Sequence, residues 1–192
     1  VLDGDNKADD GTPFIVAGMP MYNEEETIGT VVTLALKYAD AVICVDDGSS
    51  DSSARIAEAC GATVIRHRVN RGYGGALKSL FIKAIEMKAT ALVVLDSDGQ
   101  HEVADIPMLL KPILDKQADF VIGSRFIDGG GGTDMPAYRR LGIKVITAAS
   151  NLSRDISIKD THSGFRAFSA HALEVLRFDC EGMELSLEML ED

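Results

Sequence analysis

The sequence is short of cysteine, of basic residues and of long apolar runs. Its three cysteines, Cys44, Cys60 and Cys180, have neither metal-ligand spacing nor an even disulfide set, so we expect reduced core residues. No apolar run approaches the roughly 18 residues that span a bilayer, and the start carries no secretory signal. With 19 Lys and Arg against 30 Asp and Glu, the net charge of -11 argues against a nucleic-acid partner. We therefore expect a cytoplasmic protein that binds no nucleic acid.

Length and apolar content indicate one folded domain. At 192 residues the chain suits a domain with a sizeable core, and its 46% hydrophobic content excludes general disorder. Residues 1–12 are acidic and lack periodicity, which predicts a flexible N-terminal tail before a single domain over residues 13–192. Residues 187–192 have a helical pattern with no stop signal, which leaves room for a longer natural protein.

Apolar runs alternate with helical patterns along most of the chain. Strands are expected at residues 14–18, 41–45, 62–66, 91–95 and 119–123. Helices are expected at residues 23–38, 52–60, 76–88, 105–116 and 138–152. Pro20 should break the first strand, and Asn23 should cap the first helix, whose positive end the following glutamates favour. The alternation predicts an α/β fold with a mostly parallel sheet and helices on both faces.

The stretch from Ala91 to Glu102 combines a buried strand with an acidic end. After the apolar run Ala91–Leu95, Asp96 and Asp98 stand two apart, so in an extended chain both side chains point the same way. Two like charges need a counter-charge, and Mg²⁺ is usually held by one or two carboxylates together with substrate phosphates and waters. The pattern predicts a metal–diphosphate site. On the spacing alone, a solvated loop that closes the strand is the alternative.

Two further expected strands end in charged residues on the same edge of the sheet. Asp46 and Asp47 follow one strand, and they suit a base and a ribose because carboxylates accept hydrogen bonds from sugar hydroxyls and base N–H groups. Arg125 ends another strand at this edge. Because ligands of open α/β sheets collect at the carboxyl ends of strands, these residues should meet in one site.

Two glycine-rich segments lead to different structural predictions. The glycines between Gly72 and Gly75 match neither the phosphate-loop spacing nor a complete dinucleotide fingerprint, so a tight turn into a closely packed helix is expected. Residues 127–136 contain four consecutive glycines, which predict a mobile lid or, as the alternative, a plain surface loop. We expect Tyr73 to serve packing and His67 to lie on the surface.

Five motifs occur in order along the chain: MYNEEETI, VDDGSSD, DSDGQH, GSRF and DTHSGFRAF. In this order they resemble the family 2 glycosyltransferases, in particular the polyprenyl-phosphate glycosyltransferases that include the dolichol-phosphate mannosyltransferases. The resemblance covers nearly everything after residue 13. It implies a type-A nucleotide-sugar transferase fold and an inverting transfer from a UDP- or GDP-linked sugar to a polyprenyl phosphate at the cytoplasmic face of a membrane, with Mg²⁺ or Mn²⁺.

The resemblance also implies roles for individual residues. The nucleotide pocket would be lined by Pro20, Tyr22, Glu24, Asp46 and Asp47. The divalent metal would be surrounded by Asp96, Asp98 and Gln100. Donor or acceptor phosphates would be met by Arg125, with Arg139 or Arg140, and the acceptor region would hold the segment from Asp160 to Arg166.

Other activities remain open as alternatives at this point. A lipid phosphate is already ionised at neutral pH, because the second pKa of a phosphate monoester is about 6, so its transfer needs no general base. A sugar hydroxyl would need a carboxylate base, for which Asp160 is the first candidate. A sugar nucleotidyltransferase would need a basic glycine-rich loop near its start, where this chain has Glu24 to Glu26. A nucleotide-sensing domain without catalysis would lack the intact pair Asp96 and Asp98.

Overall fold

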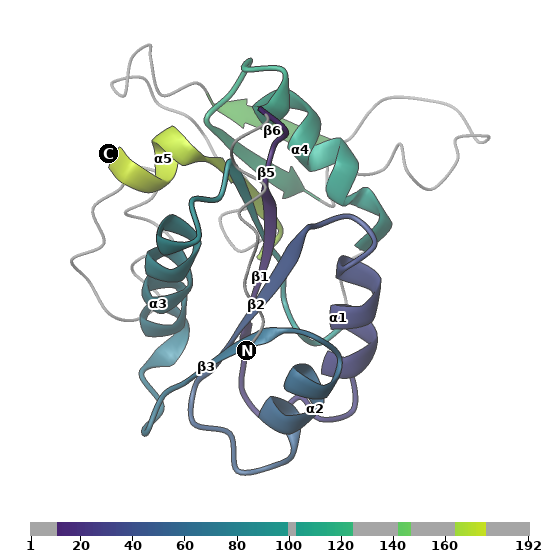
Figure 1. The fold of residues 1–192 in the computed structure, drawn as a ribbon, viewed down its shortest axis with the longest axis vertical. Helices are drawn as coiled ribbons and strands as arrows, with labels where there is room; N and C mark the ends of the chain where they lie inside the picture. The colour runs from purple at the N-terminus through teal and green to yellow at the C-terminus, as the bar shows by residue number, and fades with distance from the viewer. Residues whose placement is uncertain (1–10, 100–102, 125–141, 147–163, 176–192) are drawn as a thin grey trace.

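A sheet of seven strands forms the centre of the structure, in the order β3-β2-β1-β4-β7-β5-β6 (Figure 1). The computed structural model describes residues 11–99, 103–124, 142–146 and 164–175. The strands are β1 (Ile15–Met21), β2 (Ala41–Asp46), β3 (Thr63–Arg66), β4 (Ala91–Val94), β5 (Phe120–Ser124), β6 (Gly142–Ile146) and β7 (Arg166–Ser169). β1 pairs in parallel with β2 and β4, and β2 pairs in parallel with β3. β7 lies antiparallel between β4 and β5, and β6 pairs antiparallel with β5.

Helices cover both faces of this sheet (Figure 1). On one face lie α1 (Ile28–Ala35), α2 (Ser53–Ala59) and α4 (Ile106–Leu114), which follows the short 3-10 turn η2 (Val103–Asp105). On the other face lie α3 (Gly72–Glu86) and α5 (Ala170–Val175). The predicted α/β fold, with a mostly parallel sheet and helices on both faces, is therefore confirmed.

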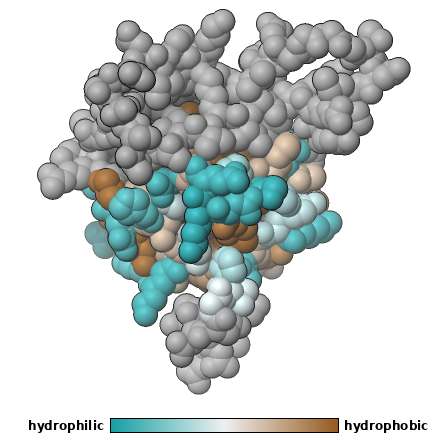
Figure 2. Space-filling model, turned by 90° about the horizontal axis from the view of Figure 1, so that it is seen from above, coloured by the Kyte–Doolittle hydropathy of each residue, from teal (hydrophilic) through white to brown (hydrophobic). Residues whose placement is uncertain are grey.

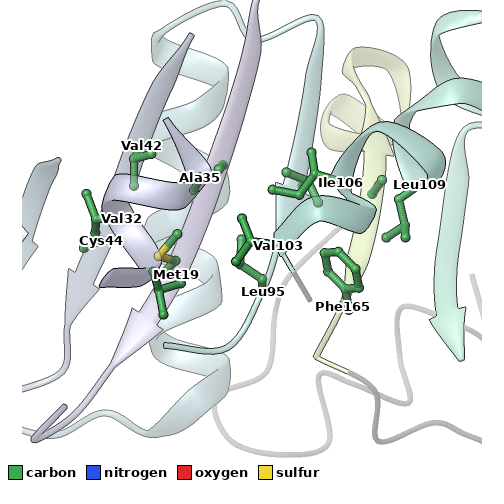
Figure 3. Packing of buried hydrophobic residues seen from close by; sticks show 14 of the residues in the cluster. Met19, Val32, Ala35, Val42, Cys44, Leu95, Val103, Ile106, Leu109 and Phe165 are labelled. Carbon is green, nitrogen blue, oxygen red and sulfur yellow. The ribbon is translucent and has the colours of Figure 1, made fainter. Parts of the chain in front are cut away.

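The central strands are apolar on both faces because each face is covered. In β1, Met19 belongs to the cluster under α1, and Val16 belongs to the cluster under α3. Figure 3 shows the first cluster, which includes Leu95, Ile106 and Phe165, the residue that precedes β7. On the α3 face, the Phe168 ring of β7 lies edge-on to Phe81 at 4.9 Å and stacked on Phe120 at 4.8 Å between ring centroids. These contacts hold β7 between β4 and β5.

Two cysteines fall in the described residues, and both are free, as expected. Burial, with a smaller contribution from the neighbouring Cys60, raises the pKa of the Cys44 thiol to about 12. In the view of Figure 2, hydrophilic residues dominate the described surface, and hydrophobic ones appear in small separate areas. None of the helices in the described part of the chain combines the length and the hydropathy of a membrane span.

Pro20 does not break the first strand, contrary to the sequence prediction. β1 continues to Met21, which pairs with Asp46 of β2. The Gly18 carbonyl accepts a hydrogen bond from the Leu95 amide, and the Met21 carbonyl accepts one from the Asp47 amide. The backbone N–H and C=O groups of successive β1 residues therefore point alternately toward β4 and toward β2. Pro20 therefore faces the β4 side, past the last paired residue of β4, where a missing N–H costs no ladder hydrogen bond.

The first helix begins later than predicted, and Asn23 does not cap it. Thr27 precedes the first residue of α1, and no acidic residue lies in its first turn. Asn23 instead adopts a left-handed backbone conformation, φ 56°. Its side-chain oxygen accepts a 2.9 Å hydrogen bond from the Ser50 amide. The polar residues after β1 thus bind the loop after β2, and this long-range contact overrides the local helix signal.

The helix predicted over residues 138–152 is wrong in its middle. Residues 142–146 form β6, whose register with β5 runs from Ser124 opposite Gly142 to Phe120 opposite Ile146. The sequence GIKVI is rich in β-branched residues, which favour a strand when an edge such as β5 is available for pairing. The remainder of the predicted helix lies outside the described residues.

Candidate functional site

A pocket of ≈ 290 Å³ lies at the carboxyl ends of β1, β2 and β4. It is formed by the end of β1, the loops after β2 and β4, and the start of α3. Six of the predicted site residues line it: Pro20, Tyr22, Glu24, Asp47, Asp96 and Asp98. The structure thus brings together two acidic clusters that are about fifty residues apart in the sequence.

Asp46 and Asp47 have different positions although they are adjacent. The Asp46 carboxylate accepts a 2.9 Å hydrogen bond from the Ser49 amide and so holds the turn after β2. Gly48 in this turn has φ +84°, and a Cβ there would meet the Asn70 amide nitrogen at 3.1 Å, so the turn requires glycine. Asp47, the next residue after β2, is the one of the pair that lines the pocket.

Asp47 is held by a buried network behind the pocket. Its Oδ1 lies 2.6 Å from Nδ1 of His67, and both side chains are 6% exposed. The Arg71 amide donates to the same carboxylate at 2.9 and 3.1 Å. His67 Nε2 lies 2.8 Å from the Ser79 hydroxyl on α3. Since a carboxylate only accepts, His67 Nδ1 donates to it. Each carboxylate oxygen can accept more than one hydrogen bond, so Asp47 retains acceptor capacity.

His67 was expected on the surface, and its burial corrects that prediction. The sequence shows a histidine after a short strand, which does not reveal a partner twenty residues earlier. The register of β2 with β3 would have revealed this partner, because Asp46 pairs with Arg66 and the next residues, Asp47 and His67, therefore lie side by side.

The backbone between Asp96 and Asp98 is fixed by hydrogen bonds of Ser97. The buried Ser97 hydroxyl donates to the Pro20 carbonyl at 2.9 Å. The Ser97 carbonyl accepts from the Thr27 hydroxyl at 2.8 Å. These bonds tie the loop after β4 to the end of β1 and the start of α1, so both carboxylates border the same pocket.

The segment before β7 packs against Asp96. A Cβ on Gly164 would overlap the Asp96 carboxylate, so only glycine fits there without displacing it. Arg166, two residues later, is 4% exposed and pairs across the sheet with Val94 and Ile122. The resemblance assigned this segment to the acceptor region, and the structure brings its described part directly beside the predicted metal ligand.

Tyr73 in the first turn of α3 lines the pocket and lies near both of these charges. Burial and, to a smaller extent, the Asp96 charge raise the pKa of its hydroxyl against the opposing Arg166 charge, to about 12 overall. The hydroxyl therefore stays protonated at neutral pH. Sequence reasoning expected a packing residue here and did not anticipate a polar group at the pocket.

The outer wall of the pocket is a network between the loops after β1 and β2. The Ser53 hydroxyl accepts from the Glu24 amide at 2.7 Å, and the Asp51 carboxylate accepts from the Glu25 amide at 3.2 Å. Although burial raises the pKa of Asp51, hydrogen bonds from Ser53 and Glu25 outweigh it and lower that pKa overall. Asp51 therefore serves the loop rather than the pocket.

Comparison with known proteins identifies the family. The sequence pattern described as glycosyl transferase family 2 matches residues 17–177. The chain belongs to glycosyl transferase family 2. This family 2 transferase is 35% identical over 180 residues to an uncharacterized protein of Methanocaldococcus jannaschii, covering 92% of this chain and 73% of the relative. It is 33% identical over 176 residues to the UDP-N-acetylglucosamine–dolichyl-phosphate N-acetylglucosaminyltransferase of Methanococcus voltae, covering 82% of this chain and 70% of the relative.

A solved structure confirms the fold of the transferase. Glucosyl-3-phosphoglycerate synthase from Mycobacterium tuberculosis, in complex with Mn²⁺, UDP-glucose and phosphoglyceric acid, matches with a TM-score of 0.66 and 22% identity. The match covers 94% of this chain and 64% of the solved chain, so the transferase spans less than two thirds of that protein. At this identity the likeness establishes the fold, and the predicted type-A nucleotide-sugar transferase architecture is confirmed.

Several predicted site residues of the transferase lie outside the described residues. They are Gln100, Arg125, Arg139, Arg140 and Asp160, together with the proposed lid over residues 127–136. Within the described ranges, no group of three or more His, Cys, Asp and Glu side chains gathers as a metal cluster. Asp96 and Asp98 nevertheless fit a hard divalent cation, because Mg²⁺ sites commonly use one or two carboxylates and complete the octahedron with substrate phosphates and waters.

Proposed function

We propose that this family 2 transferase moves a sugar from a UDP- or GDP-linked donor to a polyprenyl phosphate, with inversion and with Mg²⁺ or Mn²⁺. The observation that carries the proposal is the meeting of Asp47, Asp96 and Asp98 around one pocket at the carboxyl edge of the sheet. The name of the Methanococcus voltae relative supports a UDP-linked donor and a dolichyl phosphate acceptor. The Mn²⁺ and UDP-glucose bound to the mycobacterial synthase support a metal and a nucleotide sugar.

The nucleotide would bind at the end of the pocket formed by the loop after β2. The free acceptor capacity of Asp47 suits an N–H of the base or a ribose hydroxyl. His67 and the Arg71 amide hold that carboxylate in place, so little ordering is needed on binding. Pro20, Tyr22 and Glu24 would form the walls, and Asp46 would contribute indirectly by holding the turn.

The diphosphate would bind at the end of the pocket formed by the loop after β4. Asp96 and Asp98 would hold the cation, and Gln100 is proposed as a further ligand on sequence grounds. When bound, the cation would neutralise the charge that develops on the departing nucleoside diphosphate. Arg125, with Arg139 or Arg140, is proposed to meet the donor or acceptor phosphates, because guanidinium groups bind phosphate in bidentate geometry.

The acceptor would attack in line from the face of the sugar opposite the diphosphate. A polyprenyl phosphate is ionised at neutral pH and needs no side-chain base. Gly164 lies beside Asp96, and Arg166 pairs across the sheet with Val94, which supports an acceptor region next to the donor diphosphate. The acceptor would be met at the cytoplasmic surface of a membrane.

The test compares two acceptors with one labelled donor. We expect transfer from UDP-N-acetylglucosamine or GDP-mannose to polyprenyl phosphate in the presence of Mn²⁺, measured as label extracted into organic solvent. Asp98→Asn should abolish transfer. Asp115→Asn is the matched control, because Asp115 lies at the end of α4 and pairs with the exposed Lys111. Transfer to an uncharged oligosaccharide that is lost in Asp160→Asn would overturn the lipid-phosphate proposal in favour of a base-catalysed saccharide transferase.

A further inference from the structure

The hydroxyl of Tyr73 is sealed from solvent and has no hydrogen-bond partner among the residues that the structure describes. Its ring packs on the core cluster under α3, and the residue lines the pocket. Buried polar groups in folded proteins are nearly always paired, because an unsatisfied one lowers stability. Phenylalanine would fill the same volume without that loss. The hydroxyl is therefore poorly explained by packing.

The charges around this hydroxyl belong to the end of the pocket assigned to the diphosphate. Asp96 and Arg166 both act electrostatically on Tyr73. Val94 pairs with Arg166 across the sheet, and Asp96 follows Val94 by two residues, so both charged side chains lie on the α3 face. Tyr73 covers this face from the first turn of α3. The Tyr73 hydroxyl thus lies on the same face of the sheet as a carboxylate and a guanidinium, both close enough to act on it.

We propose that the Tyr73 hydroxyl donates a hydrogen bond to a diphosphate oxygen of the bound nucleotide. The proposal rests on the proposed function, in which the cation held by Asp96 brings the diphosphate of the nucleotide to this place. A phosphate oxygen is a strong acceptor, and a hydrogen bond to a charged group is stronger than one between neutral groups. The ligand thereby supplies the partner that the described residues lack.

The experiment measures the binding of UDP, GDP and UDP-N-acetylglucosamine by calorimetry with Mn²⁺, and thermal unfolding without ligand. In Tyr73→Phe we expect the Kd of UDP or GDP to rise about tenfold, the loss of one hydrogen bond to a charged acceptor. The melting temperature of the free protein should stay the same or rise, because the variant removes an unsatisfied hydroxyl. Tyr38→Phe is the matched control: Tyr38 packs under α1 and does not line the pocket.

Each outcome decides the proposal. An unchanged Kd in Tyr73→Phe would mean that the ring only packs. A lower melting temperature would mean that the hydroxyl already has a partner in the free protein. A loss seen with UDP-N-acetylglucosamine but not with UDP would assign the contact to the sugar and overturn the diphosphate contact. If the wild-type chain bound none of the three nucleotides, the donor class of the proposed function would fail, and this inference with it.

Discussion

Gly164→Ala should weaken metal-dependent nucleotide binding in the pocket by displacing the Asp96 carboxylate, although alanine at residue 164 adds no polar group. The new Cβ would overlap the Asp96 carboxylate. The backbone cannot retreat, because the neighbouring Phe165 carbonyl accepts a 2.8 Å hydrogen bond from the Gly123 amide and β7 is paired on both sides. The carboxylate must therefore move.

The size of this displacement sets the expected effect. Ordinary Cβ contacts begin at 3.4 Å, so the carboxylate must shift by about 1 Å. Metal–ligand distances tolerate only about 0.2 Å. Residues that orient a metal ligand change metal affinity roughly 10–100-fold, and we expect a rise of that order in the Mn²⁺-dependent Kd of UDP or GDP. Overpacking should also lower the free energy of unfolding by about 1–3 kcal/mol.

Calorimetric titration with Mn²⁺ and the nucleotide measures the first effect, and urea unfolding measures the second. Gly29→Ala is the matched control: its Cβ would meet Ile56 at 3.0 Å on the opposite face of the sheet, so it should change stability without changing the nucleotide Kd. In an Asp96→Ala background, Gly164→Ala should cause no further loss of affinity, because its effect passes through that carboxylate. Unchanged affinity in the single variant, or additive losses in the double variant, would refute the reasoning.

Three further predictions concern the loop after β2 and the histidine that holds it. Asp47→Ala should weaken nucleotide binding more than Asp46→Ala, by calorimetry, because only Asp47 lines the pocket; equal losses would contradict this. His67→Ala should raise the nucleotide Kd and lower the free energy of unfolding by about 1–3 kcal/mol, since a buried carboxylate loses its donor; Arg66→Ala, at an exposed pair, is the control. The pKa of Asp51 is lower in the folded protein than its ordinary value of 3.8, so the ionised carboxylate stabilises the fold at pH values above 3.8. This stabilisation is lost as the pH falls through the folded pKa, so the difference in free energy of unfolding between wild type and Asp51→Asn should shrink in acid. A difference that stays constant with pH would contradict this prediction.

Local patterns in the sequence were sufficient to predict most strands and the acidic edge of the sheet. Apolar runs that stop at Asp46 and at Asp96 mark buried strands, and parallel crossovers place their ends together. The six predicted residues that line the pocket follow from this rule and from the family resemblance. Their roles stay predictions.

Long-range contacts decided what the sequence could not reveal. β7 inserts between β4 and β5, which brings Gly164 against Asp96 from nearly seventy residues away. β6 became a strand because the edge of β5 was available to it. The His67 side chain is buried because Asp47 accepts its hydrogen bond. Asn23 lies outside α1 because its side chain accepts a hydrogen bond from the Ser50 amide. In each case a tertiary partner outweighed a local preference.

The central claim is that Asp96 and Asp98 hold a divalent cation together with a nucleoside diphosphate. Paramagnetic broadening by Mn²⁺ in amide NMR spectra tests it most directly, with UDP or GDP present. We predict selective broadening of the amides of Asp96 to Gly99 and of Gly164, strengthened by the nucleotide and absent in Asp98→Asn. Broadening centred elsewhere, or unchanged in Asp98→Asn, would contradict the claim.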